Sequence, residues 1–441
     1  MANAIENTSG SVPRARWLRI GVMLFLIYLV AFMDRSNISV AAPAMSHALG
    51  LGSAAIGVLL SAFFWGYVIT QVPGGLLAGK FGPKKIICIT LIVWGLSAIA
   101  TGLAPNFESL IAMRFIMGLA EGAVWPSFGV FFASWYPTSE RGRAVNFSEM
   151  ALPVSSIIMA PTAGWLIETF NYHWMFIAQG IPAFIMAIVF WRFADDTPES
   201  DKRITVRERD FIIAGRDLED RPGSFIKDVL GKPISWAFAL IYFLWLVGLY
   251  SFGLWLPSLV SQASKLNILL VGLVSAVPFI VAAVAMFLNA RASDKSKRGR
   301  AWFVGIPLFI AAVALFGSQA VSGNLIASIV LLCLAGIGLY AGFGPWWAWV
   351  LQHYTRNLSG TTLGFVNLFG NFGGIIGPIV VGLVGASGHL AAGFSVLGYF
   401  LLAATILIVV VTLLARNSTK QAGRSEPLGE PDSATVHTVH H

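Results

Sequence analysis

Long apolar segments alternate with short polar connections along almost the whole chain. Each is close to or above the roughly 20 residues that a helix needs to cross the hydrocarbon layer of a bilayer. The twelve segments are 17–46, 53–79, 84–104, 107–135, 143–169, 172–194, 233–262, 267–290, 300–321, 324–354, 358–385 and 388–415. The pattern predicts an all-α membrane protein with twelve transmembrane helices.

The longest polar segment, residues 195–232, separates the first six apolar segments from the last six. It predicts a cytoplasmic linker with a short amphipathic helix near Val206–Leu218. Two short basic loops, 74–85 and 288–300, occupy equivalent places in the two halves, which predicts two pseudo-symmetric six-helix halves. The expected units are a cytoplasmic N-terminal segment (1–16), the first half (17–194), the linker (195–232), the second half (233–415) and a disordered cytoplasmic tail (416–441).

Composition agrees with this pattern and excludes several classes of protein. Hydrophobic residues make up 56% of the chain and charged residues only 11%, against about 25% charged residues in typical soluble proteins. Apart from Arg35, Arg114 and Lys265, the 29 lysines and arginines fall near the termini and in every second connection. This distribution places both termini in the cytoplasm and speaks against a nucleic-acid partner, which would need a basic face on a soluble domain.

Catalytic and metal-binding patterns are not evident in the sequence. Cys88 and Cys333 lie inside apolar segments, outside any metal-ligand spacing, and are expected to be buried free thiols. A membrane-embedded hydrolase would need a clustered nucleophile and base or an H-x-x-x-H metal pair, and neither occurs. We therefore expect neither enzymatic activity, nor a cofactor, nor a metal site.

Five ionisable residues lie inside the apolar segments: Asp34, Arg35, Arg114, Glu121 and Glu149. A charge at bilayer depth costs several kcal/mol, about 2.5–3.5 by the milder scales, so such residues usually face a bundle interior or a water-filled cavity. A functional site is the default interpretation. The alternative is a structural charge network that joins the first and fourth helices.

Spacing limits how these residues can meet. Arg114 and Glu121 are seven residues apart, which places them on one face of a helix at a separation of roughly 10 Å. Asp34 and Arg35 are adjacent and diverge by about 100° around their helix, so one can face the cavity while the other meets the fourth helix. Carboxylates in such a cavity can carry protons, and guanidinium groups suit an anionic substrate.

Glu149 lies six residues beyond Arg143, near the expected cytoplasmic end of the fifth helix. Two interpretations are open for it: charge coupling within the membrane, or a salt bridge with the loop arginines. We favour the salt bridge.

The chain resembles the major facilitator superfamily over residues 17–415. In the first copy of the loop signature, Gly75, Gly82, Lys84 and Lys85 match the pattern, but Gly79 stands where an acid is expected; the second copy keeps Asp294. More specific segments resemble the anion:cation symporter family, which includes sugar-acid, phthalate and tartrate permeases and vesicular glutamate carriers. They are FMDRSNISVAAP (32–43), SAFFWGYVITQVPGG (61–75), MRFIMGLAEGAVWP (113–126), SWYPTSERGRA (134–144), HWMFIAQGIPA (173–183), VPFIVAA (277–283) and GNFGGIIGP (370–378).

The resemblance implies roles for several residues. Those matching Asp34 and Glu121 carry protons in the family, the one matching Arg35 meets the substrate anion, and the one matching Arg114 couples to the acids. Positions matching Tyr67 and Asn367 line the family's substrate cavity. The residues themselves add Gln71, one turn from Tyr67, and the aromatic candidates Trp347 and Tyr250, for which ordinary packing is an equal alternative.

The chain also departs from the sugar-acid carriers that it resembles. Those carriers place a polar amide where this chain has Leu152, and small hydroxyl residues where it has Gly344, Pro345 and Trp346. Fewer hydroxyl partners favour a less hydroxylated or aromatic carboxylate.

These observations predict a monomeric, proton-coupled symporter of a small organic anion that works by alternating access in the lipid bilayer of a bacterial inner membrane. The alternatives are an organic-anion exchanger or uniporter on the same fold, and a membrane sensor that binds its ligand without transport.

Overall fold

The computed structural model describes residues 14–216, 225–296, 299–321, 324–354, 359–387 and 390–422, and these residues form helices and connecting turns without a strand. The first part contains η1 (Arg16–Gly21), α1 (Val22–Leu49), α2 (Ser53–Phe81), α3 (Pro83–Gly102), α4 (Phe107–Glu121), α5 (Val124–Trp135), α6 (Thr138–Glu149), α7 (Ala151–Thr169), α8 (Tyr172–Phe193) and α9 (Val206–Ala214). The second contains η2 (Phe225–Leu230), α10 (Pro233–Ala263), α11 (Ile268–Lys295), α12 (Trp302–Ala320), α13 (Leu325–Ala341), α14 (Phe343–Leu351), α15 (Ser359–Gly385) and α16 (Leu390–Ala422).

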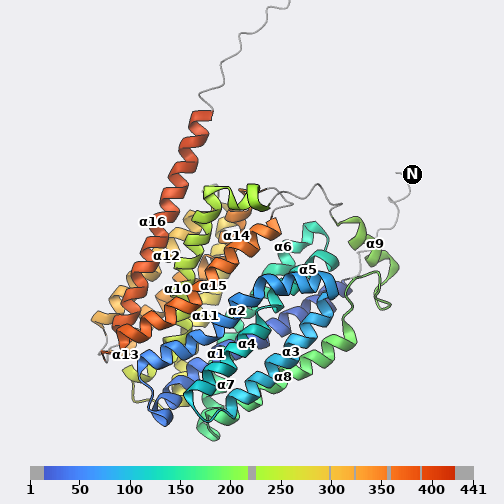
Figure 1. The fold of residues 1–441 in the computed structure, drawn as a ribbon. Coiled ribbons are helices and arrows are strands. Elements are labelled where there is room, and N and C mark those ends of the chain that lie inside the picture. Colours follow the sequence, from blue (N-terminus) through green and yellow to red (C-terminus); the bar gives the residue numbers. More distant parts are fainter. Residues whose placement is uncertain are drawn as a thin grey trace, which may run out of the picture.

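Within the described residues, eleven helical segments are long and apolar enough to cross a membrane, and a shorter apolar segment, Trp302–Ser318, lies at the predicted ninth position. The all-α fold with two six-helix halves is confirmed. Figure 1 shows the first half in blue to green and the second in yellow to red. The fourth span of each half is interrupted at its middle, between α4 and α5 and again between α13 and α14.

Local sequence explains where several helices begin and end. Asn106 and Ser109 form a capping box at the start of α4, and Asn267 and Asn324 accept hydrogen bonds from the first turns of α11 and α13. Gly50 ends α1 in the left-handed conformation, with a φ of 63°, which only glycine adopts without strain. The turns are therefore built from residues that satisfy the open helix ends.

The linker is attached to the first half by hydrogen bonds and ion pairs. α9 lies at the same end of the bundle as η1 and the last turns of α16 (Figure 1). The carboxylate of Glu208 on α9 is fully buried and accepts hydrogen bonds from the Arg16 main-chain nitrogen at 3.0 Å and from its Nη1 at 2.9 Å. Glu140 accepts from Arg16 Nη2 at 2.8 Å. We call Arg16, Glu140 and Glu208 the linker clasp.

The loop that lacks its signature acid at Gly79 gains carboxylates from another segment. The main-chain nitrogen of Lys84 donates to Asp196 at 2.7 Å, and its ammonium group lies 3.5 Å from Asp195. Both acids follow the end of α8. The loop between α2 and α3 is therefore anchored within the first half. The thiols of Cys88 and Cys333 are free, with Cys88 buried and Cys333 half-buried.

The two halves meet at the end of the bundle opposite the linker clasp. A Cβ atom on Gly57 of α2 would lie 2.6 Å from the Pro378 carbonyl oxygen of α15, and one on Gly272 of α11 would lie 2.2 Å from the Ala160 carbonyl oxygen of α7. Asn267 donates to Glu168 at 3.4 Å across the same seam. We call this region the interhalf seam. Its small residues let the backbones approach closely.

Candidate functional site

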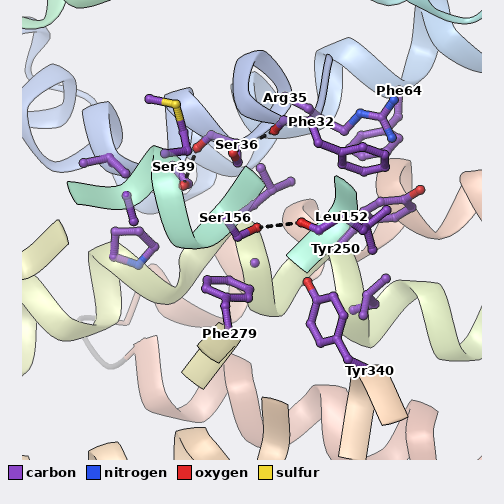
Figure 2. A pocket seen from close by; sticks show the side chains of 17 residues that line it. Phe32, Arg35, Ser36, Ser39, Phe64, Leu152, Ser156, Tyr250, Phe279 and Tyr340 are labelled. Carbon is purple, nitrogen blue, oxygen red and sulfur yellow. Dashed lines mark hydrogen bonds between the residues drawn. The ribbon is translucent and has the colours of Figure 1, made fainter. Parts of the chain in front are cut away.

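A cavity of about 60 Å³ lies between the halves, next to the interhalf seam. Figure 2 shows Arg35 and Ser36 on one side and Phe279 and Tyr340 reaching in from the other. Its lining comes from α1, α2 and α7 of the first half and from α10, α11 and α13 of the second. The lining residues are Phe32, Arg35, Ser36, Ser39, Val40, Phe64, Leu152, Ser156, Met159, Ala160, Leu249, Tyr250, Gly253, Leu254, Pro257, Phe279 and Tyr340.

Arg35 is the one charged residue in this lining. Its Nη2 forms a buried ion pair with Glu121 Oε1. Aromatic rings surround the guanidinium: its Cζ lies 4.3 Å from the ring centre of Phe32, 5.0 Å from that of Phe63 and 4.6 Å from that of Tyr67. Cation–π contacts stabilise a desolvated guanidinium and fix its orientation at the cavity wall.

Glycines bring Glu121 to this position. A Cβ atom on Gly118 of α4 would lie 1.9 Å from the Phe63 carbonyl oxygen of α2, and one on Gly122 would lie 2.3 Å from that of Tyr67. α4 therefore packs directly on the α2 backbone. Because α4 ends at Glu121, this carboxylate is held at the interruption of the fourth span, opposite α1.

The pair is incompletely satisfied. Glu121 is 1% exposed, yet among the described residues its Oε2 has no hydrogen-bond partner, and neither has Nε of Arg35. Gln71, one turn beyond Tyr67, is also buried and its Nε2 has no partner in the described part of the chain; neither Gln71 nor Tyr67 lines the cavity. Buried polar atoms are normally paired, so the unpaired atoms of the Arg35–Glu121 pair indicate a place where a further polar group can bind.

Asp34 belongs to a separate polar cluster on the other side of α1. Its Oδ2 accepts a hydrogen bond from Trp94 Nε1 of α3 at 2.7 Å, and its Oδ1 accepts from Asn37 Nδ2 at 3.3 Å. Asn37 also donates to Gln179 of α8 at 2.7 Å. The carboxylate is 1% exposed and does not line the cavity.

Arg114 joins this cluster without pairing directly with an acid. It donates to the Asp34 main-chain carbonyl at 3.1 Å and to Asn37 Oδ1 at 2.7 Å, and its guanidinium lies 5.1 Å from the Phe176 ring centre. In the described part of the chain, no carboxylate oxygen lies within 4.0 Å of it. The hydrogen-bonded connection between Arg114 and the Asp34 carboxylate therefore runs through Asn37.

The remaining candidates fall into two groups. Tyr250 lines the cavity, packs on Phe64 with ring centres 4.5 Å apart, and donates to Asn371 Oδ1 at 2.8 Å. Asn367 and Trp347 lie outside the lining.

The polar contacts of this second group are local. The main-chain oxygen of Asn367 accepts from Asn371 at 2.8 Å, and the ring of Trp347 packs on Tyr242 with ring centres 5.0 Å apart. Asn371, one turn beyond Asn367, is thus the amide that contacts a residue of the cavity lining, Tyr250.

Glu149 is not paired with the loop arginines, contrary to our favoured interpretation. Arg143 lies 3.6 Å from Glu140 instead, because these two residues are one turn apart on α6. Across the described ranges, no ion pair or hydrogen bond reaches the Glu149 carboxylate. It is half-buried at the end of α6, three residues before Leu152 of the cavity lining.

Sequence reasoning missed several polar groups. Ser36 and Ser39 line the cavity from α1, and their spacing after Arg35 could have indicated this face. Trp94, Gln179 and Tyr340 gave no signal, since a single polar atom in an apolar helix does not disturb the hydrophobic pattern. Of the residues noted as departures from sugar-acid carriers, Leu152 lines the cavity, whereas 344–346 do not.

Comparisons with known proteins agree with this architecture. The family model described as Major Facilitator Superfamily matches residues 24–378. A protein of Agrobacterium vitis named as a tartrate transporter is 31% identical over 95% of this chain and 98% of its own. One of Bacillus subtilis named as a galactarate/D-glucarate transporter is 30% identical over 91% of this chain and 95% of its own.

Solved structures with low sequence identity share the fold. A bacterial homologue of the human lysosomal transporter Spinster, in an inward-facing and occupied conformation, has a TM-score of 0.71 at 17% identity and covers 96% of this chain and 100% of its own. The D-xylose-proton symporter has a TM-score of 0.73 at 16% identity, covering 88% and 96%. The chain therefore belongs to the Major Facilitator Superfamily and is a multi-pass membrane transporter, not an enzyme.

Proposed function

We propose that this protein is a proton-coupled symporter of a small organic anion that works by alternating access. The Arg35–Glu121 ion pair beside the cavity carries this proposal. Guanidinium groups bind carboxylates with two parallel hydrogen bonds, and Arg35 is the only cation in the cavity lining. The names of the similar bacterial transporters, for tartrate and for galactarate/D-glucarate, support an organic acid as the substrate.

In this proposal, proton binding is coupled to substrate binding because Glu121 and the substrate carboxylate compete for the guanidinium of Arg35. A substrate carboxylate that binds Arg35 takes the place of Glu121 Oε1, and Glu121 Oε2 has no hydrogen-bond partner within the described ranges. A buried carboxylate without a cation is costly, so Glu121 binds a proton when the substrate arrives. Substrate and proton therefore enter the site together, and the net charge around Arg35 is unchanged.

Asp34 provides a second proton site in this proposal. Trp94 and Asn37 hold its carboxylate, and Arg114 contacts Asn37 and the main chain. A proton on Asp34 would weaken these donations and release α1 from α3 and α4. This links the charge of a buried carboxylate to the position of a helix that also carries Arg35.

The position of the interhalf seam supports alternating access. Contacts such as Gly57 with Pro378 and Gly272 with Ala160 close the cavity at the end away from the linker clasp. We place both termini in the cytoplasm of a bacterial cell, so that the seam closes the periplasmic side of a monomer in the inner membrane. Rocking of one half against the other would open the seam and close the opposite end.

Uptake into proteoliposomes with an imposed pH gradient tests the proposal. A transported organic acid should accumulate only when the outside is acidic, and the double variant D34N/E121Q should lose this accumulation. Uptake that ignores the gradient and survives both substitutions would overturn proton coupling. Trans-stimulation without a proton dependence would identify an exchanger, and saturable binding without any uptake would identify a sensor.

A further inference from the structure

The cavity has one charged group and almost entirely apolar walls. Eleven of the lining residues carry no polar side-chain atom that can form a strong hydrogen bond: Phe32, Val40, Phe64, Leu152, Met159, Ala160, Leu249, Gly253, Leu254, Pro257 and Phe279. Such walls stabilise the apolar surface of a bound molecule. They offer no hydrogen bonds to replace those that a hydroxyl group of the substrate loses when it leaves water.

The serines in the lining do not change this conclusion, because each already donates its hydroxyl proton to a main-chain carbonyl of its own helix. Ser36 donates to the Phe32 carbonyl at 2.8 Å, Ser39 to the Ser36 carbonyl, and Ser156 to the Leu152 carbonyl at 3.4 Å. Figure 2 shows these bonds returning to the helices that carry the serines. A hydroxyl has a single proton to donate. These side chains can accept from a substrate, but each would have to break a local bond to donate to it.

The tyrosines differ from each other. Tyr250 donates its proton to Asn371 at 2.8 Å. Tyr340 is buried at the far side of the cavity from Arg35 and has no hydrogen bond among the described residues. The donors open to a substrate are thus the guanidinium at one side and one phenol at the other.

A carboxyl group lies near this cavity on the side of the linker clasp. Glu149 lies three residues before Leu152, about one helical turn closer to that end. Arg35 is paired with Glu121, whereas Glu149 forms no ion pair or hydrogen bond among the described residues. When it is ionised, a carboxylate this close to Leu152 of the lining repels a second negative charge in the cavity.

From this arrangement we propose that the substrate is a compact monoanionic carboxylate with an apolar body, aromatic or aliphatic. The inference rests on the proposed function, since it assigns the substrate class of the same site. The carboxylate takes Arg35, the apolar body lies against the walls formed by Leu152, Leu254 and Phe279, and Glu149 repels a second carboxylate. Polyhydroxylated acids find too few donors.

Four acids separate charge from hydroxylation: benzoate (one charge, apolar), phthalate (two charges, apolar), gluconate (one charge, hydroxylated) and galactarate (two charges, hydroxylated). Binding to the purified full-length protein in detergent, measured by ligand-dependent thermal stabilisation, avoids the diffusion of neutral benzoic acid through bilayers. We expect benzoate to bind at least about tenfold more tightly than each of the other three.

Two substitutions test whether Glu149 and Leu152 are responsible for the selection among these four acids. E149Q should narrow the preference for benzoate over phthalate by about fivefold or more, because one repulsive charge is gone. L152N should narrow the preference for benzoate over gluconate by about fivefold, since an amide restores a hydrogen-bond partner. The matched control is E108Q, which removes an exposed carboxylate at the start of α4 and should leave both ratios unchanged.

The wild-type comparison is decisive even if a variant does not fold. Tighter binding of gluconate, phthalate or galactarate than of benzoate overturns this inference and leaves the proposed organic-anion transport standing. If none of the four acids produces a stabilisation that R35A abolishes, both the inference and the binding role of Arg35 are wrong.

Discussion

Arg35 of α1 and Glu121 of α4 form a buried ion pair in which, among the described residues, one carboxylate oxygen and one guanidinium nitrogen have no hydrogen-bond partner. The pair is held between a cage of three aromatic rings and the interruption of the fourth span. In the proposed function, a substrate anion takes the place of Glu121 on Arg35.

The first prediction concerns the shape of the cation. R35K keeps the positive charge but loses the planar fork and its stacking on Phe32 and Tyr67. Binding of the transported acid should weaken at least about tenfold, because lysine cannot form two parallel hydrogen bonds to a carboxylate. Thermal stabilisation by the acid measures the change. An unchanged affinity would mean that charge alone recognises the anion.

The second prediction separates binding from coupling. E121Q removes the carboxylate that competes with the substrate for Arg35 while keeping a side chain of similar shape. Uptake driven by a pH gradient should fall to the level of simple equilibration, whereas exchange between internal and external substrate should continue. Counterflow in proteoliposomes measures exchange. Equal loss of both activities would assign Glu121 a structural role instead.

A third prediction asks whether Asp34 is ionised in the empty protein. W94F removes the donor to its carboxylate, and W245F removes an equally buried donor to the Leu339 carbonyl at 2.9 Å. A hydrogen bond to a charged group contributes about 1.5–3 kcal/mol and a neutral one about 1 kcal/mol. W94F should therefore lower the free energy of unfolding more than W245F does. Equal losses would point to a protonated Asp34.

The fourth prediction addresses the linker clasp. E208Q removes a buried charge that Arg16 contacts through both its main chain and its side chain. Breaking a buried pair costs about 3 kcal/mol or more, so thermal unfolding should shift to clearly lower temperature. The exposed pair Arg209–Asp210 gives the comparison: D210N should cost less than about 1 kcal/mol. Similar shifts for both variants would contradict a structural clasp.

A fifth prediction concerns the interhalf seam. G57A places a methyl group against the Pro378 carbonyl, where the free distance is only 2.6 Å, and should separate α2 from α15. Distances between spin labels near Ser53 and Gly382 should lengthen, and uptake should fall several-fold. G129A, at a glycine with open space around it, serves as the control. Unchanged label distances in G57A would show that the seam can adjust.

The fold could be predicted from the sequence because a membrane helix is indicated by the length of one continuous apolar segment, without knowledge of its contacts. Apolar length predicts the spans, and the long polar segment before Pro233 predicts the two halves. The interruption after Glu121 was not foreseen, since Gly122 acts through its close approach to Tyr67, which no local pattern encodes. The amphipathic helix of the linker was expected near Val206–Leu218, and the structure has it at Val206–Ala214.

The identities of the buried charges could also be read from the sequence, but their partners could not. Asp34 meets Trp94, sixty residues further along, and Asn37 meets Gln179 on α8. Such contacts depend on how each helix is rotated about its own axis. The sequence of an almost uniformly apolar span does not indicate this rotation, because no face of the helix is distinguished from the others. The same reason explains why the side chain of Asn371, and not that of Asn367, contacts Tyr250 of the cavity lining.

The interhalf seam is built largely from main chain: Gly57 against Pro378, Gly272 against Ala160 and Gly164 against the Ile268 carbonyl. Smooth surfaces of this kind can part without withdrawing interlocked side chains from one another. In the proposed transport cycle, the barrier to opening is then set mainly by the protonation of the buried carboxylates. Protonation of these few buried residues would then determine when the two halves move relative to each other in the proposed cycle.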